Sequence, residues 1–483
     1  MTAIATLESH TRSGIRWSGL SAIFRTLIES LRLVILALFL SPVDFGLMGM
    51  AMVVIGLAEA YTDLGVSAAI IHRQDATEAE LSSLYWLNLL AGLAALAVVW
   101  ACNPLIALMF HEPRLLPIIQ VVAVVFLITP SGKQFEILLQ KELRFDVLAK
   151  QEIAASIAGF AVAITCAVAG LGVWALVYSF LVTVSIKTIC LLCIGLTRYR
   201  PRLHFHRSDL KGYVGFGLYQ LGERTVNSIS EKLDQILIGT MLGAQALGFY
   251  NFAFNLTANP IWRINPIITR VAFPVFAKIQ QDTEALRKGY FRLIRVLTTI
   301  NAPLLFGVAA VAPLAVPTIF GEKWSPSIVL IQVLSFVAFL RSAGNPIGSL
   351  QLAKGRADLG FKWNCFLLLV SIPTIYGGIA IGGVTGIAIF LLLLQSVLQV
   401  PAYLYFVRPL LGNCASEYTA AVLKPALVAG LMALVILSFP RWYQNLPPML
   451  ELAAKVGLGM VTYVSLLPIL NRQAVHDFRS MIL

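Results

Sequence analysis

Charged residues recur at helical spacing inside two otherwise apolar stretches of the sequence. In the first stretch, Arg25, Glu29 and Arg32 stand at positions i, i+4 and i+7, so one face of a helix carries all three. The second stretch has the same spacings of three and four, in Arg224, Asn227, Glu231 and Asp234. A charge at the centre of a lipid bilayer costs roughly 3 kcal/mol, so such side chains normally face a water-filled cavity or a partner.

Further polar residues follow the same logic in other apolar stretches: Glu59 with Asp63, Asn255 with Asn259 and Arg263, and Arg341 with Asn345. Arginine suits phosphate, because its planar guanidinium donates two hydrogen bonds and stays charged when partly desolvated. We therefore predict a wet cavity that binds an anionic, phosphorylated head group. Its predicted binding residues are Arg25, Arg32, Arg224, Asn227, Arg263 and Arg341.

A structural role is the alternative for each of these residues. Arg25, Glu29 and Arg32 can satisfy one another and hold a helix bundle together, and Arg224 can do the same with Glu231. The basic groups come from at least four apolar stretches, which favours a shared site. Three lysines are weaker candidates, because long side chains can reach toward an interface: Lys133, Lys187 and Lys232.

Membrane helices must position these residues. The 483 residues are 58% hydrophobic and 12% charged, about half the charge of a soluble domain, which excludes most soluble enzymes. We predict an all-α, polytopic membrane protein with about fourteen spans, from apolar runs bounded by charges, Gly or Pro. The spans cover 14–40, 45–71, 81–101, 116–139, 150–170, 173–196, 213–241, 245–274, 291–312, 327–350, 361–383, 385–407, 418–439 and 449–470.

Basic residues are distributed unevenly between the predicted loops. With the N-terminus in the cytoplasm, twenty-four fall on the cytoplasmic side, and four on the other: Arg114, Lys323, Arg441 and Lys455. This asymmetry predicts cytoplasmic termini and accounts for much of the formal charge of +12. No predicted loop exceeds roughly twenty residues, which excludes a soluble catalytic or nucleotide-binding domain.

The two halves of the chain are weakly similar. Residues 40–51 match residues 242–253 at an offset of 202, and two shorter matches follow in the same order. Six spans in each repeat leave both copies in the same orientation, related by an axis along the membrane normal, with the substrate site at their interface. We predict a six-helix lobe at 1–205, a second at 206–410 and two additional helices at 411–483.

Motifs for ATP, metal and nucleic acid are missing. There is no GxxxxGK[ST] sequence, so ATP is not the direct energy source. His204 and His206 lack further metal ligands nearby in the sequence, and the basic loop from Arg198 to Lys211 suits topology and anionic lipid better than nucleic acid. We expect no cofactor, no metal, no catalytic residues and no nucleic-acid partner.

The chain resembles a known group of transporters in its 6+6(+2) helix plan and its charged first and seventh spans. Three segments carry the resemblance further: DFGLMGMA at 44–51, LLQKELRF at 138–145 and LGFYNFA at 247–253. They are similar to the polysaccharide-transporter branch of the multidrug/oligosaccharidyl-lipid/polysaccharide exporter superfamily, and most similar to its Wzx-type flippases of the colanic-acid and exopolysaccharide type.

This resemblance implies a secondary transporter in the bacterial inner membrane. Its cargo would be an undecaprenyl-diphosphate-linked oligosaccharide, moved to the periplasmic leaflet by alternating access for exopolysaccharide, capsule or lipopolysaccharide biosynthesis. The arginines would hold the diphosphate, and membrane lipids, a polysaccharide polymerase and a chain-length regulator are the other partners it allows. The candidates for coupling to a proton or sodium gradient, or to the membrane potential, are Glu29, Glu59, Asp63, Glu231 and Asp234.

Two other classes of protein remain open. A peptidoglycan lipid-precursor exporter or multidrug exporter of the same superfamily would keep the fold and change the cargo. A membrane polysaccharide polymerase or lipid glycosyltransferase would need a large exposed loop or a compact acidic and basic catalytic cluster, and the sequence contains neither.

Overall fold

The computed structural model describes residues 21, 24–62, 70, 77–210, 214–438 and 446–482. Within these residues the side chains at 60, 214–224, 263, 264, 267, 268, 270, 271, 274, 357 and 478–482 are excepted. The described part is helical and contains no strand, which confirms the all-α fold. Eleven of its helical stretches are long and apolar enough to cross a membrane, so the chain is a multi-pass membrane protein.

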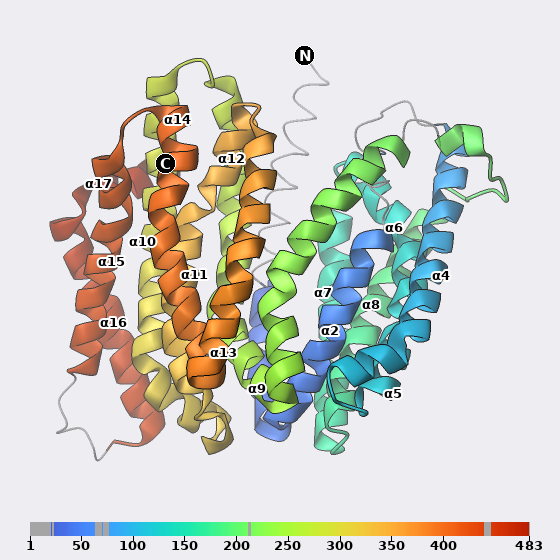
Figure 1. Cartoon of the computed structure of the whole chain (residues 1–483), viewed down its shortest axis with the longest axis horizontal. Coiled ribbons are helices and arrows are strands. Elements are labelled where there is room, and N and C mark those ends of the chain that lie inside the picture. The colour runs from blue at the N-terminus through green and yellow to red at the C-terminus, as the bar shows by residue number, and fades with distance from the viewer. Residues whose placement is uncertain are drawn as a thin grey trace. The chain divides into compact units, whose positions relative to one another are not determined.

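The chain divides into two compact units, residues 1–248 and 249–483. Unit 1 contains a helix at residues 24–39 and the beginning of α9 (Figure 1). Between them it contains α2 (Pro42–Thr62), α4 (Glu78–Met109), α5 (Leu115–Val122), α6 (Val125–Lys141), α7 (Phe145–Val168), α8 (Val173–Gly195) and the short η1 (Arg207–Leu210). The predicted division into lobes at 205/206 stays a prediction.

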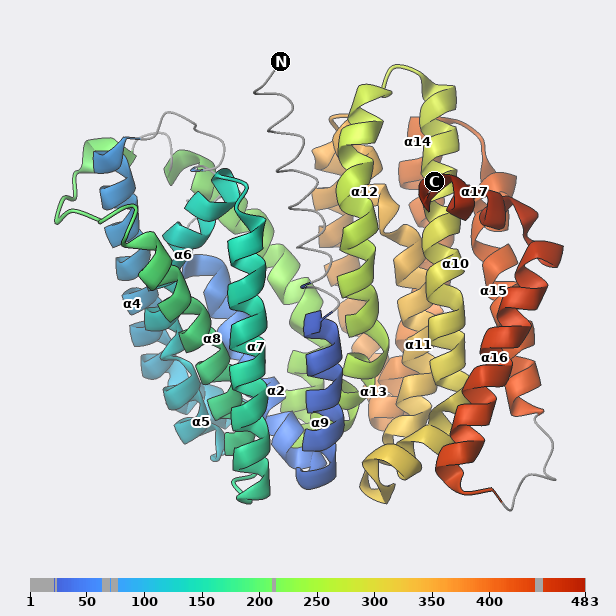
Figure 2. The ribbon, with the colours of Figure 1, turned by 180° about the vertical axis from the view of Figure 1, so that it is seen from behind.

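Unit 2 contains the rest of α9 (Val214–Lys278) and the helices that follow it. These are α10 (Thr283–Ala315), η2 (Val316–Phe320), η3 (Glu322–Trp324), α11 (Ser327–Gly344), α12 (Pro346–Ala353), α13 (Ala357–Ala402), η4 (Tyr403–Val407), α14 (Arg408–Leu411), α15 (Ala415–Leu437), α16 (Pro448–Leu470) and α17 (Arg472–Ile482). Figure 2 shows α15, α16 and α17 beside one another in red.

Glycines divide the two longest helices at or within one residue of predicted loops. Gly243 (φ 83°, ψ 179°) interrupts α9, and Gly383 (φ 57°, ψ −134°) interrupts α13. Both glycines have a positive φ, which residues with a Cβ rarely adopt. With these two breaks, the described residues of each of the fourteen predicted spans are mostly helical, although α5 and α6 share the span predicted at 116–139, and α11 and α12 share that at 327–350.

The two sequence segments with the offset of 202 lie against each other in unit 1. A Cβ at Gly46 would collide with the carbonyl oxygen of Ala244, and a Cβ at Gly248 would collide with that of Pro42. Gly248 follows Gly46 by 202 positions and Ala244 follows Pro42 by 202 positions, so the contact is reciprocal. A reciprocal contact is what a two-fold relation between equivalent segments produces, and here it requires glycine on both sides.

The basic segment after α8 folds back onto the beginning of α4. Trp86 Nε1 donates to the Arg202 carbonyl at 2.8 Å, and Ser83 Oγ donates to Asp209 Oδ2 at 2.6 Å. The hydrogen bond from Ser83 holds the pKa of Asp209 below its ordinary value. His204 Nε2 lies 3.0 Å from the same carboxylate, so these contacts hold the loop in place.

Candidate functional site

The first predicted arginines contact the hairpin formed by α7 and α8. Arg25 Nη1 lies 3.0 Å from Glu152 Oε2 on α7, with exposed side-chain fractions of 38% and 27%. Arg32 Nη1 lies 3.4 Å from Ser179 Oγ on α8, and that hydroxyl donates to the Gly159 carbonyl at 2.8 Å. Arg25 therefore has a partner on another helix, in addition to the half-buried Glu29 on its own helix as a candidate.

A second charged group joins α6 to α8. The Glu136 carboxylate, with 13% of its side chain exposed, lies between two ammonium groups. Lys187 Nζ on α8 is 3.0 Å from Oε1, and Lys133 Nζ on α6 is 3.4 Å from Oε2. Lys133 and Lys187 are each eight residues from the end of their helix, about 12 Å along its axis. The group carries one surplus positive charge well inside the apolar helices.

Buried amides accompany these charges in unit 1. Asn88 on α4 and Gln151 on α7 are 2% and 3% exposed, and neither side-chain amide has a hydrogen-bond partner in the part of the chain that the structure describes. Gln134 on α6 donates to the Leu81 carbonyl at 2.9 Å. Such amides are costly to bury without a partner and are ready to bind water or a polar ligand.

The second predicted stripe lies on α9. Asp234 is 7% exposed, and its Oδ1 accepts a hydrogen bond from the backbone N–H of Gln235 at 2.8 Å. Glu231 is exposed and Asn227 is half-buried. Lys232 Cε lies 3.6 Å from the position that a Cβ would take at Gly56 of α2. The side chain of Arg224 lies outside the described residues.

Of the two ion-coupling residues predicted for the second span, Glu59 lies near the end of α2. Glu59 is exposed there, and Asp63 lies outside the described residues. Their predicted pairing one turn apart therefore stays a prediction.

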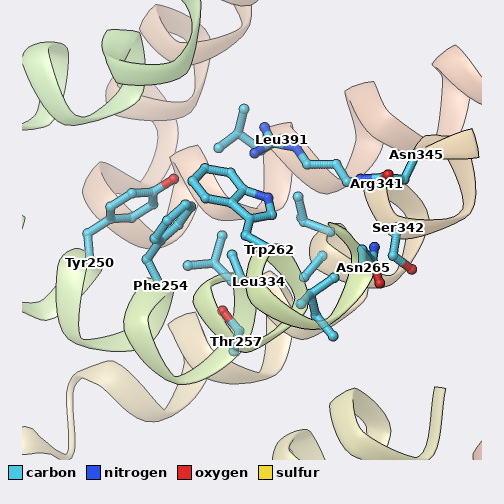
Figure 3. A pocket seen from close by; sticks show the side chains of 14 residues that line it. Tyr250, Phe254, Thr257, Trp262, Asn265, Leu334, Arg341, Ser342, Asn345 and Leu391 are labelled. Atoms are coloured by element: carbon cyan, nitrogen blue, oxygen red, sulfur yellow. The ribbon is translucent and has the colours of Figure 1, made fainter. Parts of the chain in front are cut away.

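Unit 2 contains a small polar cavity between α9, α11 and α13. The predicted residues Arg341 and Asn345 line it together with Trp262 and Asn265 (Figure 3). In that view the Arg341 side chain extends from α11 toward the Trp262 indole on α9. The cavity volume is about 30 Å³, which is room for water rather than for a sugar.

Asn265, which lines this cavity, belongs to a buried pair of amides. Asn301 Nδ2 on α10 donates to Asn265 Oδ1 at 2.9 Å, and both residues are fully buried. Asn259 donates to Asn255 one turn earlier on α9. The side chain of Arg263, which was predicted to join them, lies outside the described residues.

Comparison with known proteins identifies the family. The model of a family described as "Polysaccharide biosynthesis protein" matches residues 35–329, more than half of the chain. The chain belongs to this polysaccharide biosynthesis protein family.

Two curated relatives of this chain match it over nearly its whole length. The lipopolysaccharide biosynthesis protein WzxC of Escherichia coli strain K12 is 36% identical over 87% of this chain and 85% of its own length. The teichuronic acid biosynthesis protein TuaB of Bacillus subtilis strain 168 is 32% identical over 94% of both. Among solved structures, the lipid II flippase MurJ in an inward closed conformation has a similar fold, with a TM-score of 0.77, 12% identity, and coverage of 95% of this chain and 100% of its own.

Sequence reasoning missed two acidic residues of this polysaccharide biosynthesis family member. Glu136 and Glu152 lie inside predicted spans, and each meets a basic side chain on another helix. A signal for Glu136 was available, because it follows Lys133 by three residues on one helix face. Glu152 is 127 residues from Arg25, and no local pattern predicts that pair.

Proposed function

We propose that this protein is a flippase that moves a polyprenyl-diphosphate-linked oligosaccharide across the bacterial inner membrane for surface polysaccharide biosynthesis. The observation that carries the proposal is the group of Lys133, Glu136 and Lys187 inside the apolar helices of unit 1. A carboxylate that holds two ammonium groups at that depth keeps a net positive charge, which suits a diphosphate.

The lipid part of such a cargo needs no protein cavity, because it stays in the bilayer. The diphosphate needs cations, which unit 1 supplies from α6, α8 and the helix at 24–39. The sugars need aromatic faces and amides, and the exposed Trp262 and Asn345 side chains of unit 2 are of these types, at a cavity that in this structure has room only for water. The protein thus contains the chemistry for each polar part of the cargo.

Energy for this transport comes from an ion gradient or the membrane potential. Glu136 joins the five predicted coupling residues as a candidate, because protonation of its carboxylate would release both lysines. The uneven distribution of basic residues supports cytoplasmic termini. The protein then acts as a secondary transporter rather than an enzyme, with membrane lipids and enzymes of polymer assembly as its neighbours.

The family supports this cargo over a peptidoglycan precursor or a drug. The fold is compatible with all three, and the similarity to the MurJ structure at 12% identity concerns the fold alone. The match to the polysaccharide biosynthesis family, and the names of WzxC and TuaB, favour a polysaccharide precursor.

Complementation of a flippase-null bacterial strain tests the proposal. The wild-type chain should restore surface polysaccharide and clear the accumulated lipid-linked repeat units. Neutralising Arg25, Arg32, Arg224 or Arg263 one at a time, at normal expression, should reduce this clearance. Unchanged polysaccharide in all four variants would exclude these arginines from the cationic site, and continued accumulation with a correctly inserted wild-type chain would exclude the transport function.

A further inference from the structure

A second, larger cavity in unit 2 lies at the N-terminal ends of α10 and α15, beside the turn into α17. Its volume is about 310 Å³, within the range of small-ligand sites. Figure 1 shows α15 and α17 beside each other, and α10 contacts both. None of the predicted transport residues lines it.

Basic residues outnumber acidic residues in the lining. Arg287, Lys288, Arg295 and Lys424 face Glu284 and Glu417. Arg287 forms two hydrogen bonds with Glu417, at 2.9 and 2.6 Å, and Lys288 Nζ is 3.3 Å from Glu284. Arg295 Nε is 2.7 Å from Asp477 Oδ2.

Lys424 differs from the other basic residues of the lining in having no ion-pair partner among the described residues. Its side chain is exposed, and no carboxylate among the described residues pairs with it. The lining thus combines guanidinium groups fixed by ion pairs with an ammonium group that can reach an anion.

A buried amide provides an independent sign of a ligand. Asn471 lines the cavity and is 3% exposed, yet its Nδ2 has no hydrogen-bond partner among the described residues. Its Oδ1 accepts from the Ala474 amide at 3.4 Å at the start of α17. The oxygen therefore caps the helix, which leaves the NH₂ group as a donor. The same end of α17 carries the positive end of the helix dipole, which favours an anion.

The outer surface of α15 indicates where that anion comes from. Leu427 and Leu431 follow Lys424 at i+3 and i+7, so they share its face, and they are 64% and 42% exposed. Exposed leucines on a membrane helix face acyl chains. A lipid lying along α15 would thus bring its phosphate to Lys424 and Asn471. A soluble anion has no acyl chains and would gain nothing from the exposed leucines.

We propose that the cavity between α10, α15 and the start of α17 binds the phosphate of an anionic membrane lipid. The lipid holds α17 and the last two membrane helices against α10, at a site separate from the transport residues. Its phosphate accepts hydrogen bonds from Asn471 Nδ2 and the Lys424 ammonium group, while its acyl chains cover Leu427 and Leu431.

Thermal unfolding of the full chain, stripped of lipid in detergent, tests the proposal. Phosphatidylglycerol should raise the midpoint temperature, whereas diacylglycerol, which lacks the phosphate, and inorganic phosphate should not. N471D keeps the helix cap and replaces the donor by a negative charge, and K424Q removes the ammonium group. Each should weaken the apparent affinity for phosphatidylglycerol about 3- to 10-fold, the size of one lost hydrogen bond.

Two further variants make the result decisive. K424R should retain the affinity, and K362Q is the matched control, because Lys362 is an exposed lysine of unit 2 that does not line the cavity. Equal phosphatidylglycerol affinity in wild type, N471D and K424Q would overturn the proposal. Equal stabilisation by inorganic phosphate would overturn the assignment to a lipid.

Discussion

The two units differ in how their charged and polar side chains are grouped. In unit 1, Lys133, Glu136 and Lys187 meet inside apolar helices. In unit 2, the fully buried amides of Asn265 and Asn301 bond each other, Arg287 pairs with Glu417 near the starts of α10 and α15, and the nearly buried Arg295 pairs one to one with Asp477. Charge inside a membrane is costly unless a function needs it. The contrast is that the charged group of unit 1 has a surplus cation, which supports the proposed binding of the diphosphate there.

The largest expected effect comes from removing the central carboxylate of unit 1. Glu136→Gln leaves Lys133 and Lys187 facing each other without a counter-charge, which should destabilise the fold by about 3 kcal/mol and abolish export. The midpoint of thermal unfolding in detergent and the polysaccharide yield measure the two effects. Glu112→Gln, in the exposed pair with Arg114, is the control and should cost well under about 1 kcal/mol.

A triple apolar variant separates stability from function at the same place. Changing Lys133 to Met, Glu136 to Leu and Lys187 to Met removes all three charges together, so stability should stay within about 1 kcal/mol of wild type or rise. Export should still be lost, because the cations are gone. Normal export by this stable variant would show that the three residues are structural only.

The amide pair of unit 2 should give an intermediate effect. Asn265→Leu and Asn301→Leu each leave a buried amide without its partner and should each cost about 1 to 3 kcal/mol. The double variant should cost less than the sum of the two, by about 0.5 kcal/mol or more, as measured in a double-mutant cycle of unfolding. Strict additivity would contradict the direct hydrogen bond.

Arg341 should affect function without affecting stability. Its side chain is exposed at the cavity with Trp262, so Arg341→Gln should change stability by less than about 0.5 kcal/mol. Clearance of lipid-linked repeat units should fall about tenfold if the guanidinium binds an anion of the cargo, the equivalent of about 1.4 kcal/mol. Arg356→Gln, which affects an exposed pair with Asp358, is the matched control, and equal clearance in both variants would remove Arg341 from the site.

The smallest effect is a pH dependence in the loop between α4 and α5. The hydrogen bond from Arg114 lowers the pKa of Glu112 from its ordinary value of 4.5. The stabilisation is therefore fully present above about pH 4.5 and is lost as pH falls through the lower folded-state pKa. Unfolding measured from pH 6 to pH 3 should show a slightly shallower decline for Glu112→Gln than for wild type. Identical curves would mean that the pair contributes nothing.

The membrane helices were predictable because their signal is local. Apolar runs bounded by charges, Gly or Pro predict the membrane spans. The sequence match between 40–51 and 242–253 involves the two segments that contact each other at Gly46 and Gly248. Short polar helices carry no such signal, so α17 was not predicted.

The partners of the site residues were not predictable in the same way. The pairs of Arg25 with Glu152 and of Lys187 with Glu136 join residues 127 and 51 positions apart. Such pairs depend on how α6, α7 and α8 pack, which hydrophobic periodicity does not specify. The sequence prediction assigned no role to Glu136 and Glu152. An acidic residue inside a membrane usually has a basic partner, which is the signal that both residues carried.

Transport by the purified protein is the most direct test of the account. Proteoliposomes would carry a polyprenyl-diphosphate-linked oligosaccharide whose sugar is labelled, and a membrane-impermeant sugar-modifying reagent would report its exposure on the outer leaflet. The account predicts that the wild-type chain exposes the inner-leaflet pool and that the triple apolar variant of Lys133, Glu136 and Lys187 does not. Equal exposure by the wild type and this variant, or none above empty liposomes for the wild type, would contradict it.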